Sequence, residues 1–168
     1  MNTIWKNVIK AYRYIVSTHR WSLMYKGVQD GRYGEIEQPK SLSRADSFIV
    51  EYKGRVYVFF EELLVGCNQK GYLSVGELDV ASNSILNVQK ILEKEYHLSY
   101  PFIFEYQHEW YMVPESGANL AIDLYKFTSF PDKLKKVKTL INNIDAVDTT
   151  IAIKDNMIYL FTNIRKNG

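Results

Sequence analysis

One short unit that occurs three times constrains the fold of this 168-residue chain more than any other feature of the sequence. Its clearest copy is HLSYPFIFEYQHEWYMVPE, residues 97–115, where two apolar runs rich in aromatic and branched side chains flank the polar pair Gln107-His108. Such runs, separated by a tight polar turn, are typical of a β-hairpin. The same pattern is found at residues 45–62, around Lys53-Gly54, and at residues 147–163.

The three units align along their length, and polar residues coincide at both ends of each. The third unit turns at Asp155-Asn156. The aligned positions are Asp46, Tyr100 and Asp148 at the start of the unit, Tyr57, Tyr111 and Tyr159 in its second strand, and Glu61, Glu115 and Asn163 at its end. We therefore predict one supersecondary element that is built three times.

Two more strands are predicted after each of the first two units. Residues 72–79 and 85–92 follow the first unit, and residues 120–128 and 134–141 follow the second. A repeat of about 50 residues with four antiparallel strands is typical of a β-propeller blade. Because blades stack face to face, their inner strands are apolar on both faces, which explains continuous runs such as Val56–Phe60.

The N-terminal segment, residues 1–20, is expected to be an amphipathic helix, because apolar residues recur at helical spacing opposite lysine and arginine. Its basic side is compatible with packing on the protein's own domain or with a membrane surface. Charges interrupt any secretory signal, so we expect a cytoplasmic protein. Trp21–Tyr25 is then expected to be a lone strand, and Gly27–Ser43 a polar loop.

The predicted domain, residues 21–168, is an incomplete propeller. Two full blades are expected over residues 45–95 and 97–143, and half of a third over residues 146–168. A propeller ring typically closes with at least four blades. The strand at residues 21–25 would complete the last blade of such a ring. We expect the open end to be covered by the missing remainder of the domain or by self-association.

The composition is that of a globular protein and excludes several functional classes. Hydrophobic residues make up 46% and charged residues 24%, which indicates a packed core rather than disorder. The net charge is only +2 and no long basic run occurs, so nucleic acid is not an expected partner. No apolar run approaches the length of a transmembrane segment. With a single cysteine and no ligand spacing, we predict no metal site and no cofactor.

Several motifs, in order, resemble one known family: RADSF at residues 44–48, HLSYPF at 97–102, YMVPE at 111–115 and AVDTT at 146–150. They are similar to the N-terminal domain named after the glucosamine inositolphosphorylceramide transferases, which also occurs in bacterial proteins. That domain is in turn similar to the five-bladed propellers of glycoside hydrolase families 43 and 32. The resemblance covers residues 20–163 and implies an all-β, partial propeller of the five-bladed type, with four-stranded antiparallel blades.

The resemblance also implies catalytic roles for two aspartates. Asp46 matches the base at the head of the first blade, and Asp148 matches the orienting, pKa-setting aspartate at the head of the third. Ser47 follows Asp46 where such hydrolases usually have proline. Glycoside cleavage also needs a protonated carboxyl group, and the family's acid belongs to a fourth blade, so we expect the isolated chain to be inactive. The alternative role of both aspartates is to cap the turn before a strand.

Four other residues are predicted to contact a sugar: His97, Tyr100, Trp110 and Glu115. His97 is able to donate to a hydroxyl group or tune a carboxylate, and the alternative is a hydrogen-bonded position between blades. Tyr100 and Trp110 have apolar ring faces on which a pyranose stacks, with core packing as the alternative for Trp110. Glu115 ends the second hairpin and is a candidate ligand for sugar hydroxyls.

These observations favour a carbohydrate-active domain, either glycoside hydrolase-like or associated with a sugar transferase, whose axial carboxylates contact a glycan. The alternative is a glycan-binding or scaffolding module without catalysis. A glutamate in a fourth blade would separate the two functions, because only cleavage requires a proton donor.

Overall fold

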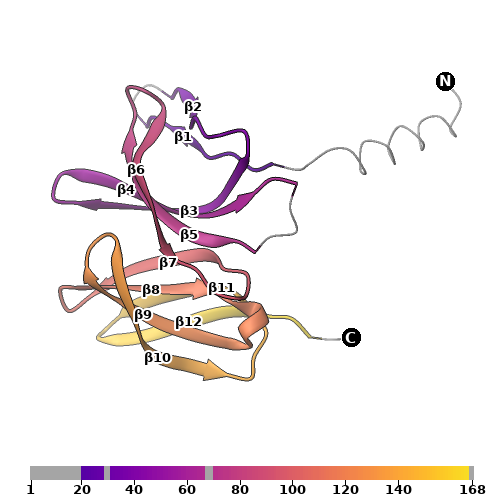
Figure 1. Ribbon diagram of the computed structural model, residues 1–168. Helices are drawn as coiled ribbons and strands as arrows, with labels where there is room; N and C mark the ends of the chain where they lie inside the picture. The colour runs from indigo at the N-terminus through magenta and orange to yellow at the C-terminus, as the bar shows by residue number, and fades with distance from the viewer. Residues whose placement is uncertain (1–19, 29–30, 67–69, 167–168) are drawn as a thin grey trace, which may run out of the picture.

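The computed structural model describes residues 20–28, 31–66 and 70–166. They form an all-β structure in which successive sheets are stacked on one another (Figure 1). The helix predicted over residues 1–20 lies outside the described residues, except for its last residue. Within the described ranges, no helix is long and apolar enough to cross a membrane.

Two of the sheets are four-stranded blades, each a meander of consecutive antiparallel strands. The first blade contains β3 (Leu42–Tyr52), β4 (Arg55–Leu64), β5 (Tyr72–Asp79) and β6 (Ser84–Leu92). The second blade contains β7 (Ser99–Tyr106), β8 (Glu109–Glu115), β9 (Ala121–Ser129) and β10 (Lys133–Asn142). A third sheet has two strands, β11 (Ala146–Lys154) and β12 (Met157–Ile164). The predicted partial propeller of antiparallel blades is therefore confirmed.

The three predicted hairpins are present, and their turns share one backbone conformation. Lys53-Gly54, Gln107-His108 and Asp155-Asn156 all have positive φ, between 51° and 74°. Two consecutive residues with positive φ are typical of the type I′ turn, whose twist matches that of the paired strands. The turns join β3 to β4, β7 to β8 and β11 to β12.

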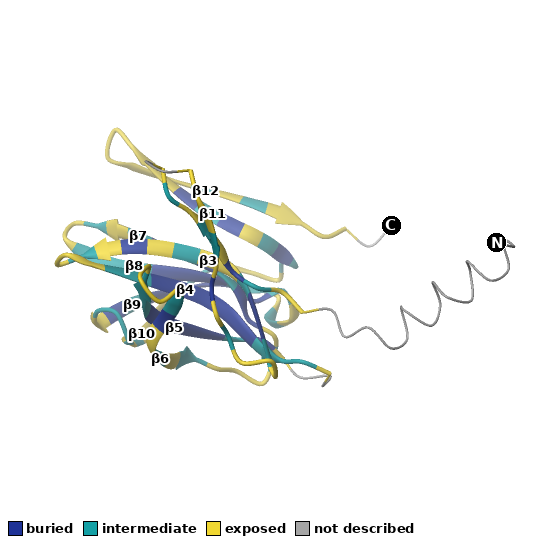
Figure 2. Ribbon diagram, turned by 90° about the horizontal axis from the view of Figure 1, so that it is seen from above, coloured by how far each residue is buried: buried dark blue, intermediate teal, exposed yellow. Residues whose placement is uncertain are grey.

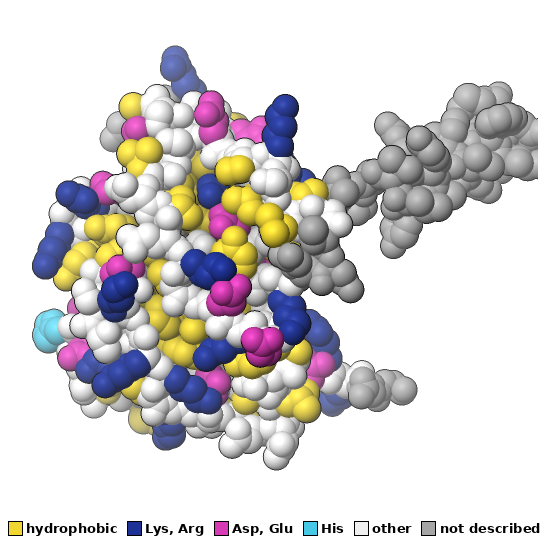
Figure 3. Space-filling view, in the orientation of Figure 1, with side chains coloured by type: hydrophobic (Ala, Val, Ile, Leu, Met, Phe, Trp, Pro, Cys, Tyr) yellow, Lys and Arg dark blue, Asp and Glu magenta, His cyan; other side chains and the backbone are white. Residues whose placement is uncertain are grey.

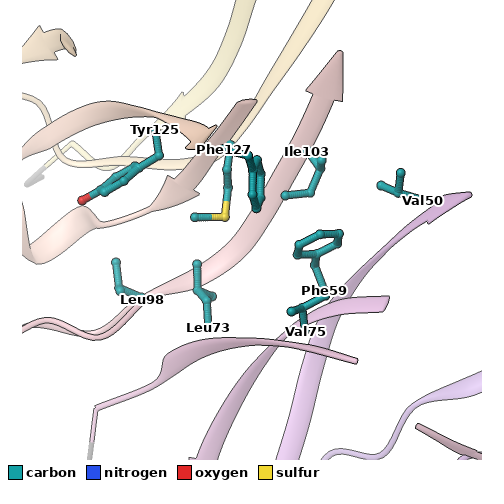
Figure 4. Packing of buried hydrophobic residues seen from close by; sticks show 9 residues of the cluster. Val50, Phe59, Leu73, Val75, Leu98, Ile103, Tyr125 and Phe127 are labelled. Carbon is teal, nitrogen blue, oxygen red and sulfur yellow. The ribbon is translucent and has the colours of Figure 1, made fainter. Parts of the chain in front are cut away.

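Aromatic and aliphatic side chains from facing blades form the core. Figure 4 shows the largest cluster, in which residues of the first blade face Ile103, Tyr125 and Phe127 of the second. Phe59 is completely buried at its centre. A further cluster joins the second blade to the third sheet through Val113, Ile122, Ala146 and Ile151. Each blade therefore buries apolar residues on both faces, as expected for stacked sheets.

A small sheet covers the other face of the first blade. It consists of β1 (Met24–Lys26) and β2 (Tyr33–Glu35), which pair antiparallel. The flanking residues Leu23 and Ile36 pack with Val58, Phe60 and Ile85 of the first blade. The two-stranded sheet thus occupies the face on which a further blade would otherwise pack.

Two predictions for this region are wrong. The strand expected at Trp21–Tyr25 is not alone, because β1 pairs with β2, and the expected loop Gly27–Ser43 contains β2. Tyr33–Glu35 is too short to show strand periodicity in sequence, and its central residue is Gly34. The glycine is required for packing, since a Cβ there would lie 2.4 Å from Cε1 of Tyr25.

Candidate functional site

A β-bulge interrupts each hairpin near the end remote from its turn. Asp46, Tyr100 and Asp148, the first aligned residues of the three units, have φ angles of 50°, 42° and 54°. Non-glycine residues seldom adopt this left-handed conformation. In each bulge, two residues of one strand lie opposite a single residue of the partner strand. For example, Asp46 and Ser47 lie opposite Phe60. Bulges redirect side chains and are frequent beside functional sites, so these three ends mark a candidate site.

The bulged ends of the three sheets converge on a pocket of about 480 Å³, here called the axial pocket. They meet because β7 contacts both β3 and β11. Four carboxylates line the pocket, from Asp46, Glu61, Glu115 and Asp148. The remaining lining residues are Trp21, Ser22, Leu23, Arg44, Ala45, His97 and Ser99. The pocket therefore combines a concentrated acidic charge with one histidine and one arginine.

Carboxylates of the axial pocket accept hydrogen bonds from the bulged backbone of the next sheet. Asp46 Oδ2 accepts from the N–H of Tyr100 at 3.3 Å, and Glu115 Oε2 accepts from the N–H of Asp148 at 3.1 Å. The Asn163 side chain donates to Asp148 Oδ2 at 3.2 Å. An ionised carboxylate has about four acceptor sites, so each of these groups is held in place and keeps acceptor capacity for a ligand.

Glu61 is the most buried acid of the axial pocket, with 9% of its side chain exposed. Its Oε1 lies 3.2 Å from Nε2 of His97. Nδ1 of His97 accepts a hydrogen bond from the N–H of Gly71 at 2.9 Å. In its neutral form the imidazole therefore carries its proton on Nε2. This N–H donates a hydrogen bond to Oε1 of Glu61.

Gly71 allows this arrangement because it has no side chain. A Cβ at this position would lie 2.4 Å from Glu61 Oε1 and 2.7 Å from the Leu98 carbonyl oxygen. Both distances are far below van der Waals contact, and the carbonyl cannot move without displacing β7. Glu61, His97 and Gly71 thus form one tightly packed unit at the pocket wall.

Burial, and to a smaller extent the charges of Asp46 and Glu115, raises the pKa of Glu61 from 4.5 to about 7. At neutral pH a large share of Glu61 therefore carries a proton. A protonated carboxyl group donates a hydrogen bond, whereas an ionised one only accepts. The axial pocket accordingly offers both a carboxyl donor and carboxylate acceptors.

Arg44 places a buried positive charge at the wall of the axial pocket. Its Nε lies 2.7 Å from Oε2 of Glu62, and its guanidinium lies 4.9 Å from the ring centroid of Phe60. The Tyr72 hydroxyl donates to the other oxygen of Glu62 at 2.8 Å. Burial, followed by this hydrogen bond, raises the pKa of Tyr72 to about 12. Because Glu62 neutralises Arg44, the net charge of the pocket remains acidic.

Four of the six predicted site residues line the axial pocket: Asp46, His97, Glu115 and Asp148. Tyr100 contributes its backbone N–H to the site, but its ring lies edge-on to Phe48 and its hydroxyl is 3.2 Å from Thr150 Oγ1. The side chain of Tyr100 therefore joins the second blade to its neighbours and does not line the pocket.

Trp110 lies near the turn end of β8, away from the axial pocket. Its ring packs against Phe130 with centroids 4.8 Å apart, and edge-on to Tyr52 at 6.3 Å. This placement corresponds to the core-packing alternative for Trp110. It follows from chain direction, because Trp110 and Glu115 are at opposite ends of the same strand.

Sequence reasoning missed Glu61 and Arg44 as pocket residues. A signal for Glu61 was present, because it aligns with Glu115 in the repeated unit. The adjacent Glu62 obscured that signal, since only one of two consecutive strand residues faces the pocket. The observed register resolves this, with Glu61 paired to Ala45 beside the bulge. Arg44 has no equivalent in the other units and could not be found by alignment.

Within the described residues, no group of three or more histidine, cysteine, aspartate or glutamate side chains is arranged to hold a metal ion. The carboxyl groups of the axial pocket contact backbone, asparagine and histidine donors, and Glu115 also lies 3.6 Å from Arg165.

The fold and the pocket define a class of protein, a partial β-propeller with an acidic pocket where the bulged ends of its sheets meet. The family model described as glucosamine inositolphosphorylceramide transferase 1, N-terminal, matches residues 34–167. The chain belongs to this family, in agreement with the resemblance of its motifs.

Curated relatives support the same assignment. Glucosamine inositolphosphorylceramide transferase 1 of Oryza sativa subsp. japonica is 31% identical over 120 residues, which are 71% of this chain and 16% of the relative. The protein of the same name from Arabidopsis thaliana is 30% identical over 131 residues, 74% of this chain and 17% of the relative. The chain thus spans only a small part of the length of these relatives.

Among solved structures, an alpha-L-arabinofuranosidase from Lactobacillus brevis has a similar fold, with a TM-score of 0.66. The match covers 89% of this chain and 56% of the arabinofuranosidase, at 12% sequence identity. At that identity the similarity shows the fold alone.

Proposed function

We propose that this chain is the sugar-recognising part of a carbohydrate-active protein, and that the axial pocket holds one sugar residue of a glycan. The observation that carries the proposal is the convergence of Asp46, Glu61, Glu115 and Asp148 on one pocket. Sugar hydroxyls donate to ionised carboxylates and accept from protonated ones. The names of the relatives, which are sugar transferases, and the glycosidase with a similar fold support a carbohydrate ligand.

The charge of the axial pocket favours a neutral or amino sugar. Glu62 neutralises the arginine that lines the pocket, and Glu61 is partly protonated. Arg165 lies 3.6 Å from Glu115, so the negative charge of the pocket rests mainly on Asp46 and Asp148. An anionic sugar, such as a uronic acid, would be repelled by the ionised groups in a partly buried site. A protonated amino group would instead gain a charge-assisted hydrogen bond. Glucosamine, which forms part of the name of these relatives, is an amino sugar.

The pocket residues divide into acceptors and one donor. Asp46 and Asp148 accept hydrogen bonds from sugar hydroxyls, and Glu115 supports Asp148 through its backbone N–H. Protonated Glu61 donates to a sugar oxygen, while His97 orients its carboxyl group. This division matches the need of a polyol ligand for both kinds of partner.

Glycoside cleavage is the second candidate function, and one observation favours it. Glu61 is a carboxyl group with a pKa of about 7 beside ionised carboxylates, which is the pairing that an acid-assisted cleavage requires. The family resemblance, however, assigns the acid to a fourth blade. We therefore expect binding without turnover from these 168 residues.

Calorimetric titration of the chain with glucosamine, glucose and glucuronic acid tests the proposal. We expect glucosamine to bind best, glucose more weakly and glucuronic acid not at all. A chromogenic glycoside assay run in parallel reports turnover. Equal affinity for all three sugars, or none for any, would contradict the assignment of the axial pocket. Turnover that Glu61→Gln abolishes would instead establish cleavage with Glu61 as the acid.

A further inference from the structure

Trp21 is an aromatic residue of the axial pocket whose side chain is exposed. It is 68% exposed and lines the pocket together with Ser22 and Leu23. Among the described residues, no aromatic ring packs against the ring of Trp21. In Figure 2 the first described residues are exposed, and Figure 3 shows hydrophobic side chains at the surface around β1 and β2. An indole left in solvent at a pocket is available to a ligand.

Hydrogen bonds fix the backbone that carries this exposed ring. The N–H of Trp21 donates to Ser43 Oγ at 2.9 Å. The carbonyl oxygen of Trp21 accepts from Gln38 Nε2 at 2.7 Å and from the N–H of Arg44 at 3.2 Å. Ser43 and Arg44 are themselves buried residues of β3. Only the two side-chain torsions of Trp21 therefore need to be ordered when a ligand binds, which keeps the entropic cost of binding small.

Trp21 and Asp148 reach the axial pocket from opposite ends of the stack of sheets (Figure 1). Trp21 lies just before β1 of the small sheet, which packs on the face of the first blade that is turned away from the second. Asp148 lies on β11 of the third sheet, which packs on the second blade. A ligand in the pocket is therefore flanked by an aromatic residue on one side and by a carboxylate on the other.

These two flanks match the two kinds of surface on a pyranose ring. The hydroxyl groups of a pyranose lie around its rim and donate hydrogen bonds to carboxylates. The faces of the ring are made of C–H groups and stack on the apolar face of an indole. A ligand that is apolar throughout would leave the carboxylates without partners, which costs free energy. An open-chain polyol has the hydroxyl groups but no ring face to stack.

The two rings that the sequence predicts for such stacking are engaged elsewhere. Tyr100 lies edge-on to Phe48, and Trp110 packs on Phe130. Among the described residues that line the axial pocket, Trp21 is the aromatic one. The aromatic contact expected for a sugar therefore falls to a residue that precedes the repeated units and has no aligned equivalent in them.

We propose that Trp21 is the stacking platform of the axial pocket and selects cyclic sugars over open-chain polyols. One face of the pyranose lies on the indole while its hydroxyl groups bond to Asp46 and Asp148. The inference rests on the proposed function, that the axial pocket binds a sugar residue, and adds the residue that recognises the ring itself.

The test compares two ligands that both carry an amino group and hydroxyl groups. Methyl glucosaminide is locked as a pyranose, whereas glucosaminitol, the reduction product of glucosamine, is an open chain. Calorimetry measures the Kd of both for the wild type, Trp21→Ala and Trp21→Phe. The matched control is Tyr33→Ala, because Tyr33 is 69% exposed on β2 and is not among the residues that line the axial pocket.

We expect Trp21→Ala to weaken binding of methyl glucosaminide about fivefold and to leave the Kd of glucosaminitol unchanged. Trp21→Phe should restore most of the lost affinity, because phenylalanine also offers an apolar ring face. Tyr33→Ala should bind both ligands as the wild type does. Since both side chains are exposed, neither alanine variant should change Tm. Saturation with methyl glucosaminide should alter the tryptophan fluorescence of the wild type but not that of Trp21→Phe.

The outcomes separate this inference from the proposed function. An unchanged Kd of Trp21→Ala for methyl glucosaminide would overturn the role of Trp21 and leave sugar binding in place. Equal losses for both ligands would also overturn it, because Trp21 would then act on the amino group or on the fold rather than on the ring. Absence of binding of either ligand to the wild type would overturn the sugar site and the inference together.

Discussion

The two ends of the hairpins differ in chemistry, although left-handed residues occur at both. At the turn ends, aromatic rings pack closely, with Phe130 4.8 Å from both Tyr52 and Trp110 between centroids. At the axial ends, carboxylates gather around a pocket and the backbone is left-handed at Asp46 and Asp148. Burial of aromatic surface stabilises a fold, whereas burial of carboxylates costs free energy. The turn ends thus stabilise the fold, whereas the polar site at the axial ends lowers its stability.

Truncation in the aromatic core is expected to have the largest effect on stability. Phe59 is completely buried between the first two blades, so Phe59→Ala should lower the free energy of unfolding by about 3–5 kcal/mol. Urea denaturation measures this change. The matched control is Ile49→Ala, because Ile49 is 61% exposed on the adjacent strand β3 and should change stability little. Equal losses in both variants would mean that the blades are not packed as described.

Neutralisation of Glu61 is expected to stabilise the axial end in a pH-dependent way. The folded-state pKa of about 7 exceeds the ordinary 4.5, so the folded protein binds more protons between these values and loses stability as the pH rises through them. Glu61→Gln removes this loss and should stabilise the chain by about 2–3 kcal/mol at pH 8, with little change at pH 4.5.

Thermal unfolding of wild type and Glu61→Gln across this pH range measures the effect. The exposed Glu51 on β3 supplies the control variant Glu51→Gln, which should show no such pH dependence. A Glu61→Gln curve parallel to that of the wild type would show that Glu61 titrates normally and is not the proton donor.

Changes of the bulged aspartates are expected to affect binding more than stability. Asp46→Asn and Asp148→Asn remove a charge while asparagine tolerates the left-handed backbone. Each should weaken binding of glucosamine by about 1–2 kcal/mol, roughly tenfold in Kd, as measured by calorimetry. Glu105→Gln, near the turn end of β7, is the control and should bind as the wild type does. A Kd unchanged in both aspartate variants would remove them from the site.

The smallest effect is expected for Tyr100, whose hydroxyl contacts Thr150 rather than the pocket. Tyr100→Phe should cost at most about 1 kcal/mol of stability and leave sugar affinity unchanged. Chemical denaturation and calorimetry on the same preparation separate the two outcomes. A loss of affinity without loss of stability would show that the ring reaches the ligand.

The parts of the fold that sequence predicts well are those set by local pattern. Apolar runs with the pattern of strands lie on both sides of the turns at Lys53-Gly54 and Gln107-His108. The structure contains both hairpins. The bulges could not be predicted. The sequence around Asp46, Tyr100 and Asp148 has the pattern of an extended strand, and these residues are left-handed only because one strand of each pair has an extra residue there.

Side-chain direction limits what the repeat predicts about the site. Asp46 and Tyr100 share a backbone position, yet only the short aspartate side chain lines the pocket, because the tyrosine ring reaches Phe48 instead. Glu61 was missed for the opposite reason, since its role depends on burial beside His97 and Gly71, which are distant in sequence. Alignment of units therefore locates the site but does not identify all of its groups.

Chemical-shift mapping by NMR during a glucosamine titration shows directly whether the sugar binds in the axial pocket, because it reports both ends of the hairpins at once. We expect the backbone amides at Asp46, Tyr100 and Asp148 to shift with saturation, while those of the turns at Gln107-His108 and Asp155-Asn156 do not. Shifts confined to the turn ends, around Tyr52 and Trp110, would contradict it and transfer the sugar site to the aromatic cluster.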